Sequence, residues 1–146
     1  MNNFKKIFTI NDFHDYFFAC STLYSIAFDE ESNRLMFDID YVFKKTKTIN
    51  NNHYISPATL VFENVSNINI ETEGEFDIDI DEIVKTNLNN ETNIYNWTIR
   101  TLYGVNIIFN ASEFYLYIRK KPIYTNNLRL TLEEHGDISF CENTYD

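Results

Sequence analysis

Hydrophobic and polar residues alternate with a period of two along most of the chain. In the range 34–43, alternate residues are Leu, Phe, Ile, Tyr and Phe, and two of the residues between them are Asp. A strand with one buried face has this pattern, because successive side chains point to opposite faces. The range 23–28 is expected to be its hairpin partner across the polar turn 29–33. Its predicted faces are Leu23, Ser25 and Ala27 on one side and Tyr24, Ile26 and Phe28 on the other.

Similar short alternating or apolar runs follow through the rest of the sequence. The expected strands are 58–63, 66–71, 75–81, 94–103, 105–109 and 113–119, with weaker ones at 128–132 and 138–141. Two segments are less regular. The range 11–21 fits either a helix capped by Asn11 or the opening of a first strand, and 81–87 fits a short helical turn.

Many short strands with short connections predict an α+β fold that is mostly β. We expect an antiparallel sheet, folded as a sandwich or a partly open barrel, with one or two short helices. The chain has 146 residues and no linker-like segment, so a single domain spanning 1–146 is predicted.

The charge balance excludes several classes of partner. Lys and Arg number 12 and Asp and Glu 22, which gives a net charge of −10. Duplex nucleic acid and anionic membranes bind basic faces, so neither is expected as the main partner. The longest unbroken apolar run is 16–20, far short of the roughly 20 residues that a membrane span needs. These features predict a cytoplasmic protein.

Negative charge is concentrated in one stretch. Seven of the 22 acidic residues lie within 71–82. A calcium loop beginning at Asp77 fails, because Glu82 stands where the loop needs Gly and Leu88 where it needs Glu. Three interpretations stay open: a solvated strand face, a docking surface that steers a basic protein partner and, as the least favoured, a looser metal site. The candidate partner-binding residues are Glu71, Glu73, Glu75, Asp77, Asp79 and Asp81, together with the aromatic Tyr115 and Tyr117.

No catalytic motif stands out. Phosphate-binding glycine motifs and paired CxxC zinc motifs are absent from the sequence. His14, Asp15 and His135 are the candidate lining of a pocket, but a nucleophilic site would need an accompanying elbow or oxyanion signature. We therefore expect no cofactor, no metal site and no enzymatic activity.

Several short segments together resemble a known group of proteins. They are Phe13-His14-Asp15, the strand and turn that follow, the run 58–65, and the run 134–140. In outline they resemble small uncharacterised bacterial β-rich proteins whose relatives include immunity proteins of polymorphic toxin systems. The chain departs from that pattern at Tyr16, where a small residue is usual. The resemblance implies a cytoplasmic, non-enzymatic protein that binds a toxin domain, and it implies no catalytic residues.

Three functional hypotheses follow. The leading one is a non-enzymatic acidic binding protein, of the toxin-neutralising immunity type, that docks a basic partner through its acidic strand. The second is a small β-barrel ligand-binding protein or hydrolase with a pocket lined by Tyr and His. The third is a homodimeric structural module.

Overall fold

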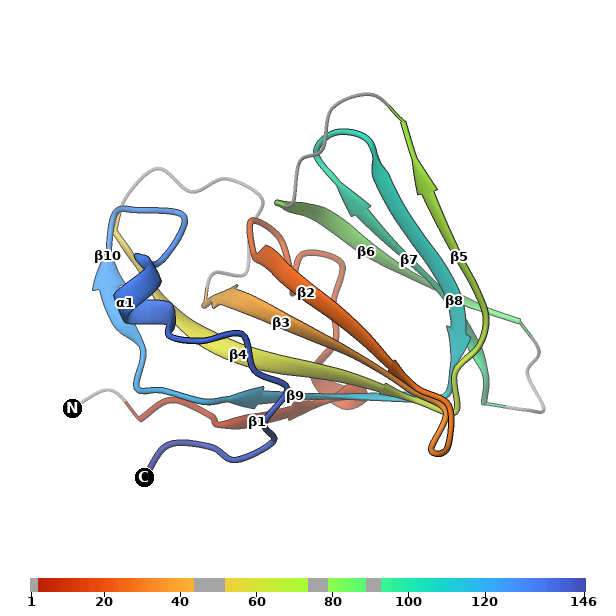
Figure 1. The fold of residues 1–146 in the computed structure, drawn as a ribbon, viewed down its shortest axis with the longest axis horizontal. Coiled ribbons are helices and arrows are strands. Elements are labelled where there is room, and N and C mark those ends of the chain that lie inside the picture. Colours follow the sequence, from red (N-terminus) through yellow and green to blue (C-terminus); the bar gives the residue numbers. More distant parts are fainter. Residues whose placement is uncertain (1–2, 44–51, 74–78, 89–92) are drawn as a thin grey trace.

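A computed structural model describes residues 3–43, 52–73, 79–88 and 93–146. The chain forms two antiparallel sheets that pack as a sandwich (Figure 1). The predicted antiparallel, mostly β architecture is thus confirmed in its sandwich form, with one short α-helix. The first sheet has the order β1-β9-β4-β3-β2, and β10 pairs with β4. Its strands are β1 (Ile7–Thr9), β2 (Thr22–Asp29), β3 (Arg34–Val42), β4 (His53–Glu63), β9 (Glu113–Ile118) and β10 (Ile123–Thr125).

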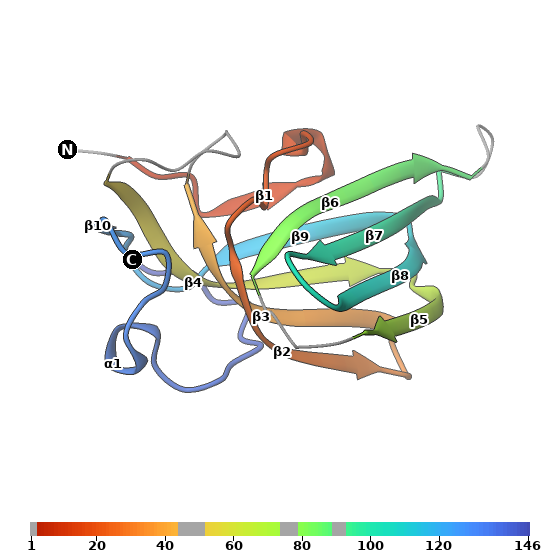
Figure 2. The same ribbon diagram turned by 90° about the horizontal axis from the view of Figure 1, so that it is seen from above.

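The second sheet has the order β5-β8-β7-β6. Its strands are β5 (Ser66–Thr72), β6 (Ile80–Asn87), β7 (Tyr95–Thr101) and β8 (Val105–Ala111). Seen from above, β2 and β5 are the edge strands on one side of the sandwich, while β1 and β6 lie on the opposite side (Figure 2). After β10 the chain crosses the outer face of the first sheet, where the short helix α1 (Leu132–His135) lies (Figure 1).

The core is rich in aromatic side chains from the facing sheets. Alternation along β9 turns Phe114, Leu116 and Ile118 inward, as predicted, and all three are fully buried. The rings of Phe62 and Trp97 lie 5.0 Å apart between the two sheets, and the Trp97 indole donates a hydrogen bond to the Ala111 carbonyl. Edge-to-face contacts of this kind add to the free energy gained by burying the rings.

The predicted hairpin is confirmed, but its first strand contains a bulge. β2 pairs with β3, and the register shifts between Leu23 and Ser25. The extra residue changes which side chains share a face. Leu23, Ile26 and Phe28 lie opposite inward-facing β3 residues, whereas Tyr24 turns to the outer face and contacts Asp40. The sequence prediction that Leu23 shares a face with Ser25, and that Tyr24 shares one with Ile26, was therefore wrong.

Other expected elements differ from the structure. The range 11–21 forms neither a long helix nor a strand: a single 3₁₀ turn (Ile10–Asp12) precedes a series of turns. The range 81–87 is not a helical turn but most of β6, because Ile80 and Ile83 are buried and the strand pairs with β7. The expected strand 75–81 lies largely outside the described residues. The weak terminal strands 128–132 and 138–141 do not form.

Replacing Phe62 with Ala should destabilise the protein strongly. The side chain is fully buried among Phe37, Trp97 and Phe109, so truncation leaves a cavity that the two sheets cannot refill. Chemical denaturation should show a loss of about 3–5 kcal/mol in the free energy of unfolding. The control Tyr103→Ala removes an aromatic side chain of a residue that is 69% exposed and should change stability by less than about 0.5 kcal/mol. Equal losses in both variants would contradict this account of the core.

Candidate functional site

Two aspartates on the outer face of β3 form the centre of a buried charged cluster. Asp38 and Asp40 alternate with the inward-facing core residues of the strand, so the pattern predicts that they face water. Both are nevertheless 0% exposed. The C-terminal segment covers them, since Leu130, His135 and Ser139 all contact their carboxylates.

The imidazole of His135 lies between the two carboxylates. Its Nε2 is 3.0 Å from Asp38 Oδ2, and its Nδ1 is 2.5 Å from Asp40 Oδ1. A neutral imidazole carries one donor and one acceptor nitrogen, and an acceptor nitrogen would repel a carboxylate oxygen. With both carboxyl groups ionised, the geometry therefore favours the doubly protonated, positively charged ring.

Local capping explains how His135 reaches this position. Thr131 begins α1: its hydroxyl accepts a hydrogen bond from the Glu134 N–H, and the Glu134 carboxylate accepts one from the Thr131 N–H. Gly136 ends the helix at a φ of 83°, a conformation that favours glycine. This single turn carries His135 at its last position and directs the ring onto β3.

A second cation and a phenol complete the cluster. Arg119, which follows β9, donates to Asp38 at 2.7 Å and also to the Thr59 hydroxyl and the Ser139 carbonyl. Tyr24 donates its hydroxyl proton to Asp40 at 2.6 Å, and its ring lies 4.0 Å from the His135 ring. Two carboxylates, one guanidinium and one imidazolium sum to zero charge. A buried cluster must be neutral and fully hydrogen-bonded in this way to offset the cost of desolvation.

These contacts shift the pKa of three groups. Burial by itself lowers the pKa of His135, but its hydrogen bonds with Asp38 and Asp40 outweigh this effect and raise that pKa to about 9. Burial opposes ionisation of Asp38, yet the hydrogen bonds from His135 and Arg119 hold the pKa of that carboxyl below its usual value. Burial, and then the hydrogen bond to Asp40, raise the pKa of Tyr24.

The charged cluster of Asp38, Asp40, Arg119 and His135 fastens the C-terminal segment to β3 and is called the clamp below. Its charged groups are saturated by one another and are shielded from solvent by the C-terminal segment. Further contacts continue along that segment: the Thr59 hydroxyl donates to the Cys141 carbonyl, and Arg34 pairs with Glu142. His135 was a candidate site residue from the sequence, but its partners were not. Asp38, Asp40 and Arg119 occupy the polar positions of alternating strands, a pattern that predicts exposure to solvent.

The contacts of His14 involve other residues than those of His135 in the charged cluster. His14 accepts a hydrogen bond from the Tyr16 N–H and lies edge-on to Phe17. Asp15 is exposed in the turn after His14.

The acidic candidates do not lie on one strand. Glu71 is in β5 and Glu73 follows it, whereas Asp79 and Asp81 are at the start of β6. Asp79 forms an ion pair with Arg129 and accepts a hydrogen bond from Thr22. Glu75 and Asp77 lie outside the described residues. Tyr115 and Tyr117 are elsewhere again, stacked at 6.2 Å on β9 in the first sheet.

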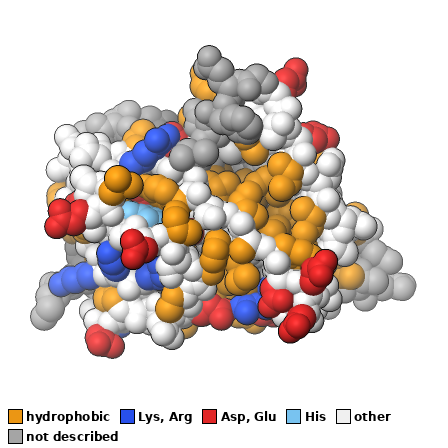
Figure 3. Space-filling model, in the orientation of Figure 1, with side chains coloured by type: hydrophobic (Ala, Val, Ile, Leu, Met, Phe, Trp, Pro, Cys, Tyr) orange, Lys and Arg blue, Asp and Glu red, His pale blue; other side chains and the backbone are white. Residues whose placement is uncertain are grey.

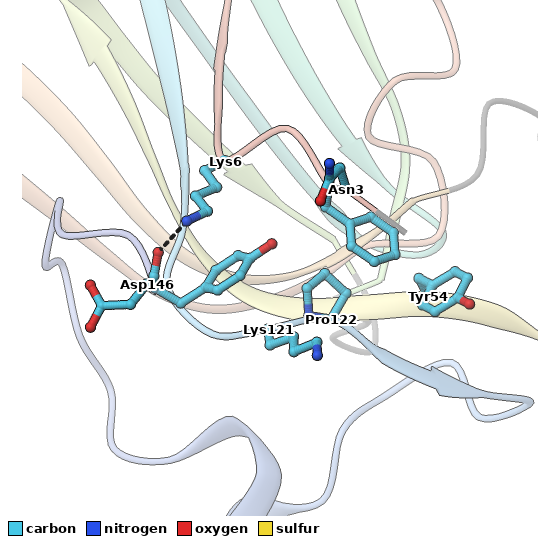
Figure 4. Close-up of a pocket in the computed structure, with 8 residues that line it drawn as sticks. Asn3, Lys6, Tyr54, Lys121, Pro122 and Asp146 are labelled. Atoms are coloured by element: carbon cyan, nitrogen blue, oxygen red, sulfur yellow. Dashed lines mark hydrogen bonds between the residues drawn. The ribbon is translucent and has the colours of Figure 1, made fainter. Parts of the chain in front are cut away.

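A surface pocket lies where the N-terminal and C-terminal segments meet (Figure 4). It encloses about 510 Å³ and is lined by Asn3, Phe4, Lys6, Tyr54, Lys121, Pro122, Tyr145 and Asp146. Lys6 donates to the Tyr145 carbonyl at 2.8 Å, so its ammonium group holds the C-terminal segment. None of the candidate pocket residues named from the sequence lines this pocket.

Comparison with protein-family models, curated proteins and solved structures finds no match for this chain. In the described ranges, no group of three or more His, Cys, Asp or Glu side chains is arranged to hold a metal ion. The same ranges contain no helix that is both long enough and apolar enough to cross a membrane.

The charged cluster makes stability depend on pH. An unfolded His titrates near pH ~6.5, below the folded value of about 9, so protonation of His135 favours the folded state. This contribution is complete below about pH 6.5 and is lost as the pH rises through about 9. The melting temperature of the wild type, followed by circular dichroism, should therefore fall across this window.

His135→Gln should be less stable than the wild type by about 3 kcal/mol near neutral pH, because it leaves the buried carboxylates without their second cation. It should also lose most of the decline in melting temperature across this window. The control His14→Gln should retain that decline. Identical pH profiles for the wild type and His135→Gln would show that the imidazolium does not stabilise the fold.

Proposed function

We propose that this protein is a non-enzymatic binding module that engages a basic protein partner. The partner class implied by the resemblance is a toxin domain, which the module would neutralise in the cytoplasm as an immunity-type protein. The observation that carries the proposal is exposed acidic charge that forms no ion pair with the Lys and Arg side chains of the described residues.

The distribution of ion pairs supports this proposal. Lys5, Arg34, Arg100, Arg119 and Arg129 each pair with a carboxylate of the same chain. By contrast, Glu30, Glu31, Glu71 and Glu73 are exposed, and within the described ranges none of them forms an ion pair with Lys or Arg. Exposed charge of one sign accelerates encounter with a partner of the opposite sign.

The closed state of the charged cluster also favours binding over catalysis. His135, Asp38 and Asp40 are paired with one another and covered by the C-terminal segment, so these three side chains are not available to exchange protons with a substrate. An accessible base or nucleophile is the first requirement of hydrolysis. The exposed groups described above are instead suited to recognition.

The partner should be sought among the products of adjacent genes, above all a basic toxin-like C-terminal domain. Co-expression of the module should relieve growth arrest caused by that domain. The association rate of the purified pair, measured by surface plasmon resonance, should fall steeply as salt is raised. Failure to bind any basic neighbour, or binding that is insensitive to salt, would count against the function.

A charge reversal tests the position of the attraction. Glu71→Lys should lower the association rate several-fold at low salt, because it removes negative charge at the end of β5. Asp137→Lys is the matched control, since it makes the same change in net charge at an exposed residue after α1. Equal effects of the two variants would mean that only the total charge matters and that the β5 end is not part of the contact surface.

A further inference from the structure

The sandwich is open along the side where β2 and β5 are the edge strands. The two ribbons diverge there in Figure 1, and Figure 3 shows hydrophobic side chains gathered on that face. Ile26 and Phe28 lie opposite the buried Phe37 and Leu35 in the hairpin register, so they belong to the inner face of the first sheet. Ile70 likewise lies opposite the buried Ile107.

Inner-face side chains of a sandwich are normally covered by the opposite sheet. Here Ile26 is 36% exposed, Phe28 44% and Ile70 50%. These three residues are named the edge patch. Each is an apolar side chain facing the space between the sheets, and the described part of the chain leaves each of them substantially open to solvent.

The backbone of β2 is also available along the edge patch. Among the described residues, β2 is the last strand of its sheet, and Thr22 alone makes a further bridge beyond it, to Asp79. The range 23–28 carries no charged side chain and no proline. Natural edge strands are usually shielded by such residues, because their free N–H and C=O groups accept another strand. An edge whose six residues 23–28 lack them is suited to strand addition.

Acidic residues flank the edge patch in the sequence on both of its strands. Glu30 and Glu31 follow Phe28 in the turn of the hairpin, and Glu71 and Glu73 follow Ile70. All four are exposed. A ligand with apolar residues at its centre and cations at its ends would complement this arrangement.

We propose that β2 accepts an extended segment of the basic partner as an additional strand, with alternate apolar side chains on the edge patch and Lys or Arg at both ends. This inference rests on the proposed function and identifies its binding surface. A second copy of the chain is disfavoured as occupant, because it would bring a further charge of −10 and its own acidic turn to the same edge.

The probe is the synthetic peptide KKVTVTVKK, which places valines on one face of a strand and lysines at its ends. Isothermal titration calorimetry should detect binding to the intact protein, and amide hydrogen exchange should slow within 23–29. The peptide EEVTVTVEE tests the charge requirement and should bind at least about tenfold more weakly. A KKVTVTVKK peptide N-methylated at its three valines, and another N-methylated at its two threonines, test backbone pairing. One of the two should lose binding, because only one set of amides faces β2.

Matched protein variants test the position of the site. Phe28→Ser and Ile26→Ser should each weaken peptide binding about tenfold. Ile7→Ser should not, because Ile7 is equally exposed, at 44%, but lies on β1 at the opposite edge of the sheet. Circular dichroism of each variant establishes that the fold is retained. If Phe28→Ser fails to fold, Ile26→Ser and the N-methylated peptides still decide the matter.

The outcomes separate the edge site from the proposed function. A basic partner that binds the wild type and Ile26→Ser equally would overturn the edge site and leave the function standing. Equal binding of the Lys-ended and Glu-ended peptides would contradict acidic recognition itself. Three results would each overturn strand addition by a basic partner. The first is that KKVTVTVKK does not bind at millimolar concentration, and the second is that both N-methylated peptides bind as tightly as the unmodified one. The third is that the protein forms a dimer that Ile26→Ser dissociates.

Discussion

The ionic contact between β3 and the C-terminal segment is the constraint on which the rest of the structure depends. Asp38 and Asp40 are completely buried, and two unpaired carboxylates in that position would be prohibitively costly. His135 and Arg119 neutralise them, and each approaches from a different part of the chain. Removing either cation leaves an uncompensated buried charge. The C-terminal segment therefore belongs to the folded core of the protein, although its sequence has the polar character of a surface loop.

This clamp determines which surfaces are left for recognition. α1 and the residues after it cover Asp38 and Asp40 on the outer face of the first sheet. The second sheet covers the inner face. Among the described strands β2 ends this sheet, and Ile26 and Phe28 are exposed along it. A rigid sheet fastened on both faces presents a preorganised edge, which reduces the ordering cost of adding a strand.

Local alternation was enough to predict most of the strands, because a period of two directly reports one buried face. The hairpin 23–43, the run 113–119 and the inward faces of Phe37 and Phe114 all followed from it. Features that depend on distant contacts did not. The bulge that turns Tyr24 outward, and the burial of Asp38, are set by tertiary pairing with Asp40 and His135. β6 was misread as a helical turn, since its strand form depends on β7.

The charge arithmetic links the clamp to the open edge. The clamp contains two carboxylates and two cations once His135 is protonated, so it contributes no net charge. Counting that proton, the formal −10 becomes −9, and all of this excess lies outside the clamp. Two copies of the protein therefore repel each other, which opposes pairing of their apolar β2 edges. The same negative charge would attract a cationic strand. Under the proposed function, this charge disfavours the pairing of two copies and favours a basic occupant at the β2 edge, while the apolar side chains would provide the contact area.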